Sequence, residues 1–149
     1  GYLPLGVTAT TGAVYDAFLS DDRAKTFFHG HSYTANPLAC AVAIASLNLF
    51  REEPVLDRVS RLERQLCDGF AALRGLGDVR VIGGVAAVEL ASDKPGYLDG
   101  IGPRLAAAFL DRGLLLRPLG NVVYFMPPYC ITESETAWAL EQIVHVLRG

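Results

Sequence analysis

The chain has 149 residues, of which 51% are hydrophobic and 19% charged, and its formal net charge is −3 at pH 7. This composition excludes a disordered or low-complexity chain and is sufficient for a domain with its own core. The acidic balance and dispersed arginines argue against a nucleic-acid surface, which needs clustered Lys and Arg. No apolar stretch reaches the ~20 residues of a membrane span, so no membrane segment is expected.

Three widely spaced cysteines, Cys40, Cys67 and Cys130, form no Cys-x-x-Cys pair. This pattern indicates reduced thiols, and we expect a cytoplasmic protein whose cysteines are buried as small apolar side chains. His29 and His31 have no Cys or His cluster around them to complete a coordination shell. A metal site is therefore not expected.

The first part of the chain predicts a strand and a short helix. Residues 3–10 have the apolar content of a short buried strand. Thr10 or Thr11 can cap a helix that runs to Leu19, followed by a polar loop.

A second helix is predicted from about Pro37 to about Arg51, after a loop over residues 27–36. Its apolar residues cover almost the whole circumference. Because such a helix is normally sandwiched between other elements, we expect a larger protein or a dimer to cover it.

From residue 54 onward the pattern predicts helix, strand pair, helix, strand pair, helix. The elements expected are a helix from Pro54 to about Leu73, two strands within 79–91 about Gly83 and Gly84, a helix over 101–112 stopped by Gly113, paired strands at 114–117 and 122–126, and a last helix opened by a capping box over 132–135. This order predicts a small α/β layer packed behind a sheet.

Two stretches carry residues suited to chemistry. Residues 29–37 read HGHSYTANP and end at a predicted helix N-terminus, whose free N–H groups favour phosphate. Gly30 permits a close backbone approach, and the hydroxyls of Ser32 and Thr34 can donate to phosphate oxygens. Ser, Thr and Asn before a helix are also ordinary caps, so both interpretations stay open.

The second stretch, residues 116–129, reads LRPLGNVVYFMPPY. Arg117 is flanked by apolar residues at a predicted strand end, and such an arginine needs an anionic partner, which can be a bidentate carboxylate. A structural ion pair with one of the acidic residues of the chain is the alternative. Tyr124 is expected on the neighbouring strand, either near the same anion or as a core aromatic side chain.

Together these stretches resemble the class III (ω-type) aminotransferases, fold type I enzymes that depend on pyridoxal 5'-phosphate (PLP). The resemblance extends over nearly the whole chain, through residues 1–11, 29–41, 81–90 and 117–129. Residues 117–120 and 124–129 more narrowly resemble the branch that makes 7,8-diaminononanoate in biotin biosynthesis.

The resemblance implies an α/β fold in two parts. Residues 1–53 would be the end of the large PLP-binding domain with the domain-linking helix, and residues 54–149 the small C-terminal domain. In the homodimer that the family forms, Gly30, His31 and Ser32 would reach the PLP phosphate of the neighbouring subunit.

The same resemblance implies substrate contacts. Arg117 would bind the carboxylate of 8-amino-7-oxononanoate, Tyr124 would line the substrate pocket, and Gly1 would also touch the substrate. The amino donor would be S-adenosylmethionine or lysine, and nothing in the sequence separates the two.

The lysine that forms the Schiff base with PLP is expected upstream of Gly1, since neither Lys25 nor Lys94 has a matching context. We therefore expect the chain to be a C-terminal fragment without activity alone. Two alternatives stay open: another class III aminotransferase acting on 4-aminobutyrate or ornithine, and a non-catalytic interaction domain.

Overall fold

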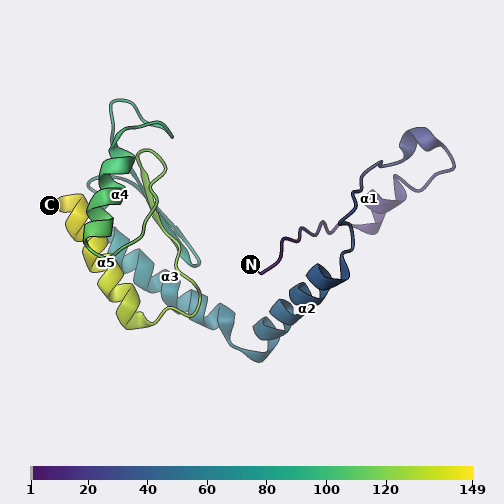
Figure 1. Ribbon diagram of the computed structural model, residues 1–149, viewed down its shortest axis with the longest axis horizontal. Coiled ribbons are helices and arrows are strands. Elements are labelled where there is room, and N and C mark those ends of the chain that lie inside the picture. The colour runs from purple at the N-terminus through teal and green to yellow at the C-terminus, as the bar shows by residue number, and fades with distance from the viewer. Residues whose placement is uncertain (1) are drawn as a thin grey trace. The chain divides into compact units, whose positions relative to one another are not determined.

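The computed structural model describes residues 2–149, and the chain divides into two units, Gly1–Glu53 and Pro54–Gly149. The first unit contains the helix α1 (Gly12–Asp16), the 3-10 helix η1 (Arg23–Lys25) and the helix α2 (Pro37–Glu52), as labelled in part in Figure 1. Among its described residues only Ala39 is buried.

The strand predicted at residues 3–10 is wrong. Among residues 2–149 this segment has no ladder partner, and it is exposed throughout. A strand needs a neighbour for its backbone N–H and C=O groups, and the described residues of this unit contain no other strand to provide one.

Helix α1 is capped by Thr11, whose side chain accepts a hydrogen bond from the Val14 N–H. It ends at Asp16 and not at Leu19. The N–H groups of Phe18 and Leu19 bond to carbonyls only three residues back, so the helix tightens into turns after Asp16.

Helix α2 confirms the predicted helix almost to the residue. Asn36 caps it, and Pro37 occupies the first turn, where the missing N–H costs nothing. Most of its apolar side chains are exposed, including Leu38, Ile44 and Leu47. The helix thus has the all-round apolar surface that the sequence predicts.

The second unit is a three-stranded antiparallel sheet with helices on one side (Figure 1). Its elements are α3 (Val55–Ala71), β1 (Gly77–Ile82), β2 (Val85–Leu90), α4 (Ile101–Asp111), β3 (Val122–Phe125) and α5 (Glu133–Arg148). The strand order is β1-β2-β3, with Ile82 opposite Val85 and Ala87 opposite Tyr124.

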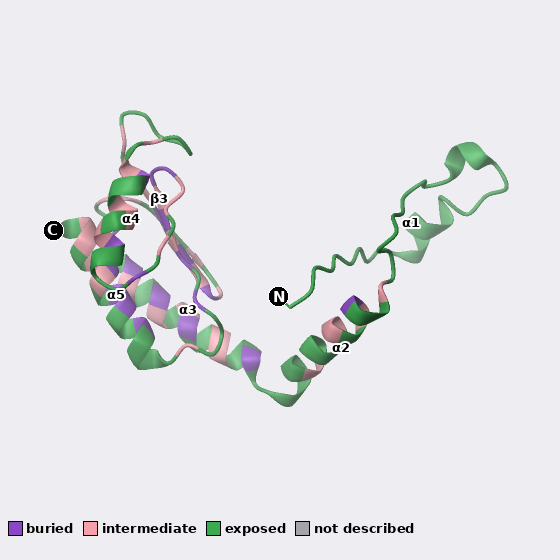
Figure 2. Ribbon diagram, in the orientation of Figure 1, coloured by how far each residue is buried: buried purple, intermediate pink, exposed green. Residues whose placement is uncertain are grey.

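The core of this unit lies between the helices and one face of the sheet, where Figure 2 shows the buried residues. Buried residues alternate along β2 and β3, as expected for strands with one covered face. The largest fully enclosed apolar side chains are Leu66, Phe70, Leu73, Val88, Phe109, Val123 and Ile143.

Local sequence signals explain the boundaries of these elements. Gly83 and Gly84 form the two-residue turn of the β1–β2 hairpin, and Gly83 has a φ of +52°. Gly113 (φ +79°) ends α4 in a Schellman motif, in which its N–H bonds to the Leu110 carbonyl and the N–H of Leu114 bonds to the Phe109 carbonyl. The predicted helix stop at Gly113 is confirmed.

The predicted strand at residues 114–117 is wrong. Leu114 is buried in the core and Leu116 packs against it, but among the described residues this segment forms no ladder. The isolated bridge that follows it joins Leu119 and Val122. Pro118 fixes its own φ and has no N–H, so no regular ladder develops before the turn. The pairing of β3 is instead with β2.

The expectation of buried cysteines is also wrong for two of the three. Cys67 and Cys130 are exposed, and Cys40 is half-buried. Cys67 lies beside Leu66 on α3, off the face that carries Leu62, Leu66 and Phe70 into the core. None of the helices within residues 2–149 has the length and apolarity to cross a membrane.

Candidate active site

The loop before α2 is ordered by its own side chains. The Thr34 hydroxyl accepts a hydrogen bond from the His31 N–H at 3.1 Å, and the Thr34 N–H donates to the His31 carbonyl at 3.0 Å. Ala35 has a φ of +55°, the left-handed region that L-residues adopt at a cost. The loop is thus held in a turn that nothing in the sequence indicated.

The N-terminus of α2 does not offer the free N–H groups that the sequence suggested. The Asn36 side chain accepts from the N–H groups of Leu38 and Ala39, the Asn36 carbonyl accepts from Cys40, and Pro37 has no N–H. Asn36 is therefore an ordinary cap, and an anion has to be held by the loop itself.

Donors in the loop remain available for that task. Within residues 2–149, the N–H groups of Gly30 and Ser32 and the Ser32 hydroxyl have no hydrogen-bond partner, and all are exposed. A side chain added at Gly30 would meet nothing within 4 Å, so its backbone is open to approach.

His31 provides a further donor in its neutral form. Its Nδ1 accepts a hydrogen bond from the Tyr33 N–H at 3.2 Å, which places the proton on Nε2. The ring lines an open cavity of about 1000 Å³ within the first unit, together with His29, Thr34 and Leu5.

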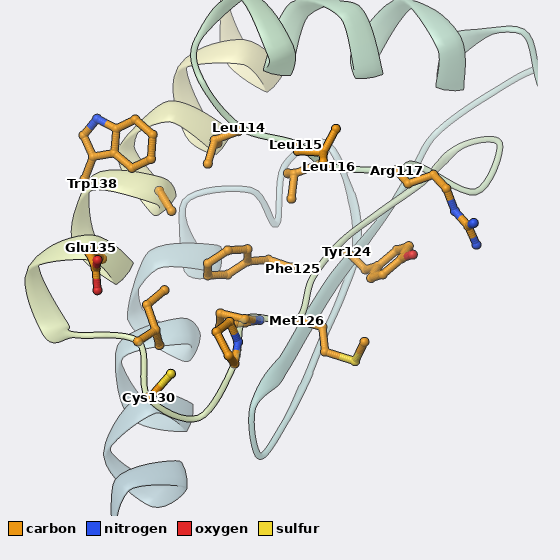
Figure 3. A pocket seen from close by; sticks show the side chains of 14 residues that line it. Leu114, Leu115, Leu116, Arg117, Tyr124, Phe125, Met126, Cys130, Glu135 and Trp138 are labelled. Carbon is orange, nitrogen blue, oxygen red and sulfur yellow. The ribbon is translucent and has the colours of Figure 1, made fainter. Parts of the chain in front are cut away.

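Arg117 and Tyr124 line one cavity of about 690 Å³ in the second unit. Figure 3 shows them near one another at one end of it, with Glu135 and Trp138 at the other. Arg117 lies just before the turn at Leu119–Val122, and Tyr124 lies on β3, on the face of the sheet away from the helices. The structure brings together the two residues that the sequence paired.

The guanidinium of Arg117 makes no hydrogen bond or ion pair with any residue in the described part of the chain. Arg80, in contrast, forms ion pairs with Asp78 and Glu89. A structural ion pair for Arg117 is therefore not observed within these residues, and its five donors are free for an anion.

The far end of this cavity carries a negative charge. The Thr132 hydroxyl, and then the Thr132 N–H, donate to the Glu135 carboxylate and lower its pKa below the ordinary value of 4.5. Glu135 therefore stays ionised at neutral pH. The sequence indicates Glu135 only as part of a capping box, because its place in this cavity depends on how α5 packs.

Three further predictions concern residues outside the loop before α2 and outside the cavity of Arg117 and Tyr124. Gly1 lies outside the described residues. Lys25 lies in η1 and Lys94 in the loop before α4. Within residues 2–149 no group of three or more His, Cys, Asp or Glu side chains could hold a metal ion.

The family model described as aminotransferase class-III matches residues 1–147. Among curated proteins, the adenosylmethionine-8-amino-7-oxononanoate aminotransferase of Synechococcus elongatus is 51% identical over 138 residues, covering 91% of this chain and 32% of that protein. The protein of the same name from Geobacter sulfurreducens is 42% identical, covering 100% of this chain and 36% of that protein. The chain spans about a third of the length of these relatives.

Solved structures agree with these matches. The adenosylmethionine-8-amino-7-oxononanoate aminotransferase of Methanocaldococcus jannaschii superposes with a TM-score of 0.81 at 32% identity, over 93% of this chain and 34% of that chain. A PLP-bound amine transaminase from an uncultivated Pseudomonas species superposes with a TM-score of 0.86 at 29% identity, over 99% of this chain and 36% of that chain.

Proposed function

Because the chain belongs to the class III aminotransferase family, we propose that it forms part of a PLP-dependent enzyme that aminates 8-amino-7-oxononanoate to 7,8-diaminononanoate. The names of its relatives support this substrate. The observation that carries the proposal is that Arg117, which has no ion pair within residues 2–149, lines one cavity together with Tyr124. A cation with five free donors is suited to the carboxylate of such a substrate.

The fold is that of the fold type I transferases, as the solved neighbours indicate. Within this fold we assign residues 1–53 to the end of the large PLP-binding domain and the domain-linking helix. Residues 54–149 are then the small C-terminal α/β domain. The boundary between the two assignments coincides with the division of the chain into its two units.

The loop residues Gly30, His31 and Ser32 fit the phosphate of PLP. The N–H groups of Gly30 and Ser32, which have no partner within residues 2–149, are donors of the kind that phosphate oxygens accept. The Ser32 hydroxyl and Nε2–H of His31 are further donors of this kind. We propose that they serve the active site of the partner subunit in a homodimer. The chemistry that PLP supplies when bound is the temporary storage of the amino group between donor and acceptor.

Around that chemistry, this chain orients the substrate. Arg117 binds the carboxylate in two parallel hydrogen bonds and so fixes the direction of the molecule. Tyr124 and the apolar side chains of the cavity, such as Leu116 and Met126, contact its hydrocarbon chain and exclude water. Charge-assisted hydrogen bonds of this type contribute about 1.5–3 kcal/mol.

The proposal includes a cytoplasmic location and a donor that is either S-adenosylmethionine or lysine. The first is supported by three free cysteines, Cys40, Cys67 and Cys130, which suit a reducing compartment. The name of the relatives favours S-adenosylmethionine as the donor.

The test is a turnover assay of an enzyme of the full length of the relatives, in which this chain is the matching part. We expect 7,8-diaminononanoate from 8-amino-7-oxononanoate with one of the two donors, and none with 4-aminobutyrate as the only amino source. Transamination from 4-aminobutyrate or ornithine, without product from 8-amino-7-oxononanoate, would show that the enzyme is a different class III aminotransferase.

A further inference from the structure

Asn121 is one of only two buried polar side chains found in the described part of the chain, and it is 1% exposed. Its Nδ2 donates to the Leu90 carbonyl at 2.8 Å, and its Oδ1 accepts from the Gly96 N–H at 3.0 Å. Its backbone carbonyl accepts from the Leu90 N–H at 2.9 Å. One side chain therefore ties the end of β2 to the loop over residues 91–100.

The turn that carries Asn121 has no room to shift. Gly120 has a φ of +59°, and a Cβ there would lie 1.8 Å from the Gly96 carbonyl oxygen. On its other side, a Cβ at Gly102, in the first turn of α4, would lie 3.0 Å from the Gly120 carbonyl oxygen. The turn is packed between the loop and α4.

The loop over residues 91–100 is closed by a second set of bonds. The Ser92 hydroxyl donates to the Asp99 carboxylate, and Asp99 Oδ1 accepts from the Ile101 N–H at 2.9 Å. These two bonds, the hydroxyl bond first, lower the pKa of Asp99, so the loop is closed by a carboxylate at neutral pH. The two side-chain hydrogen bonds of Asn121, to Leu90 and Gly96, are called the clasp below. The loop that the clasp holds is also bonded to the start of α4, through Asp99 and the Ile101 N–H.

This clasp lies between the two residues of the proposed carboxylate site. Arg117 precedes Asn121 by four residues, and Tyr124 follows it by three on β3. Between them, the Leu119 N–H donates to the Val122 carbonyl at 2.9 Å and the Val122 N–H donates to the Leu119 carbonyl at 3.1 Å. Arg117 has no partner of its own within residues 2–149, so the position of its backbone depends on this turn.

We propose that Asn121 is a positioning residue, which fixes the turn that presents Arg117 and so sets the selectivity of the site for a carboxylate. This inference rests on the proposed role of Arg117. Only one orientation of the Asn121 amide satisfies both bonds, since a carbonyl needs a donor and an N–H needs an acceptor. Aspartate, of nearly the same shape, satisfies only the bond to Gly96.

The experiment measures kcat/KM of the complete enzyme for 8-amino-7-oxononanoate and for its methyl ester. The ratio of the two values reports recognition of the carboxylate, and a general loss of activity cancels from it. We expect Asn121→Asp to lower this ratio about tenfold, since a misplacement of about 1 Å can cost up to ~100-fold. In an Arg117→Ala background, Asn121→Asp should not change the ratio further.

The control is Thr136→Val. Thr136 is the other buried polar residue, also 1% exposed, and its hydroxyl donates to the Thr132 carbonyl at 2.9 Å. This variant also loses a buried hydrogen bond and should destabilise the domain, but the ratio should stay at its wild-type value.

If Asn121→Asp does not fold, Ser92→Ala is the second variant, because it loosens the loop over residues 91–100 to which Asn121 is bonded. It removes the bond to Asp99 and should lower the ratio roughly two- to tenfold, the effect of one ordinary hydrogen bond. An unchanged ratio in the variants of Asn121 or Ser92, while Arg117→Ala removes the selectivity, would overturn this inference alone. Unchanged selectivity in Arg117→Ala would overturn the proposed role of Arg117 itself.

Discussion

The substitution Gly120→Ala should destabilise the second unit more than the substitution Gly83→Ala. Gly120 and Gly83 both have a positive φ, +59° and +52°. For an L-residue this conformation costs about 1–2 kcal/mol, which both alanine variants share. The two sites differ in the space around the added methyl group.

At Gly83 the nearest atom to an added Cβ is Cγ1 of Val59 at 3.5 Å, an ordinary contact. At Gly120 the nearest is the backbone oxygen of Gly96 at 1.8 Å, which cannot move without the loop. Overpacking of this kind adds about 1–3 kcal/mol. We therefore expect a loss of about 2–5 kcal/mol in the free energy of unfolding for Gly120→Ala and about 1–2 kcal/mol for Gly83→Ala.

Urea unfolding of the 149-residue chain, followed by tryptophan fluorescence, measures this difference. Trp138 is the only tryptophan and lies on α5, so the signal reports on the second unit. If the slope with urea is unchanged, the shift in midpoint gives the change in stability. Equal losses in the two variants would refute the argument, because they would show that the contact with Gly96 has no energetic consequence.

Further predictions concern the core, the last helix and the thiols. Phe109→Ala, which empties a fully enclosed site, should lower the free energy of unfolding by about 3–5 kcal/mol in the same assay, and a loss near zero would contradict the assigned core. Thr132→Ala removes the cap of α5 and should cost about 1 kcal/mol. Because hydrogen bonds from Thr132 place the folded-state pKa of Glu135 below its ordinary value of 4.5, this carboxylate stabilises the fold above that pH, and its contribution is lost as the pH falls through the lowered pKa. Glu135→Gln should therefore reduce the loss of stability that occurs as the pH falls from neutral through 4.5 and below, and an unchanged pH profile would contradict the capping geometry. In the native 149-residue chain, Cys67 and Cys130 should react with a thiol reagent before Cys40, and the reverse order would contradict their exposure.

Much of the second unit could be predicted because its signals are local. The helix that forms α3 was predicted from Pro54 onward, and the glycine pair at 83–84 predicted the hairpin. The capping box from Thr132 to Glu135 predicted the start of α5. Each of these signals acts within a few residues, so one sequence suffices to identify it.

The errors came where the outcome depends on distant partners. Residues 3–10 and 114–117 have the composition of strands, but a strand exists only if another strand pairs with it. The role of Asn121 could not be predicted for the same reason, since its partners are the backbone of Leu90 and Gly96, 31 and 25 residues away.

The candidate site was predicted in part. The short turn between Arg117 and Tyr124 made their proximity predictable, and both residues line the same cavity. The free N–H groups expected at the start of α2 were not found, because Asn36 occupies them. Whether Gly30, His31 and Ser32 hold a phosphate stays a prediction.

The central claim is that Arg117 binds the carboxylate of the substrate. Its most direct test is the comparison of Arg117→Ala with the wild-type enzyme, using 8-amino-7-oxononanoate and its methyl ester. The loss of a charge-assisted pair predicts a fall of about 10- to 100-fold in kcat/KM for the acid and little change for the ester. Equal falls for the acid and the ester, or none for either, would contradict the claim.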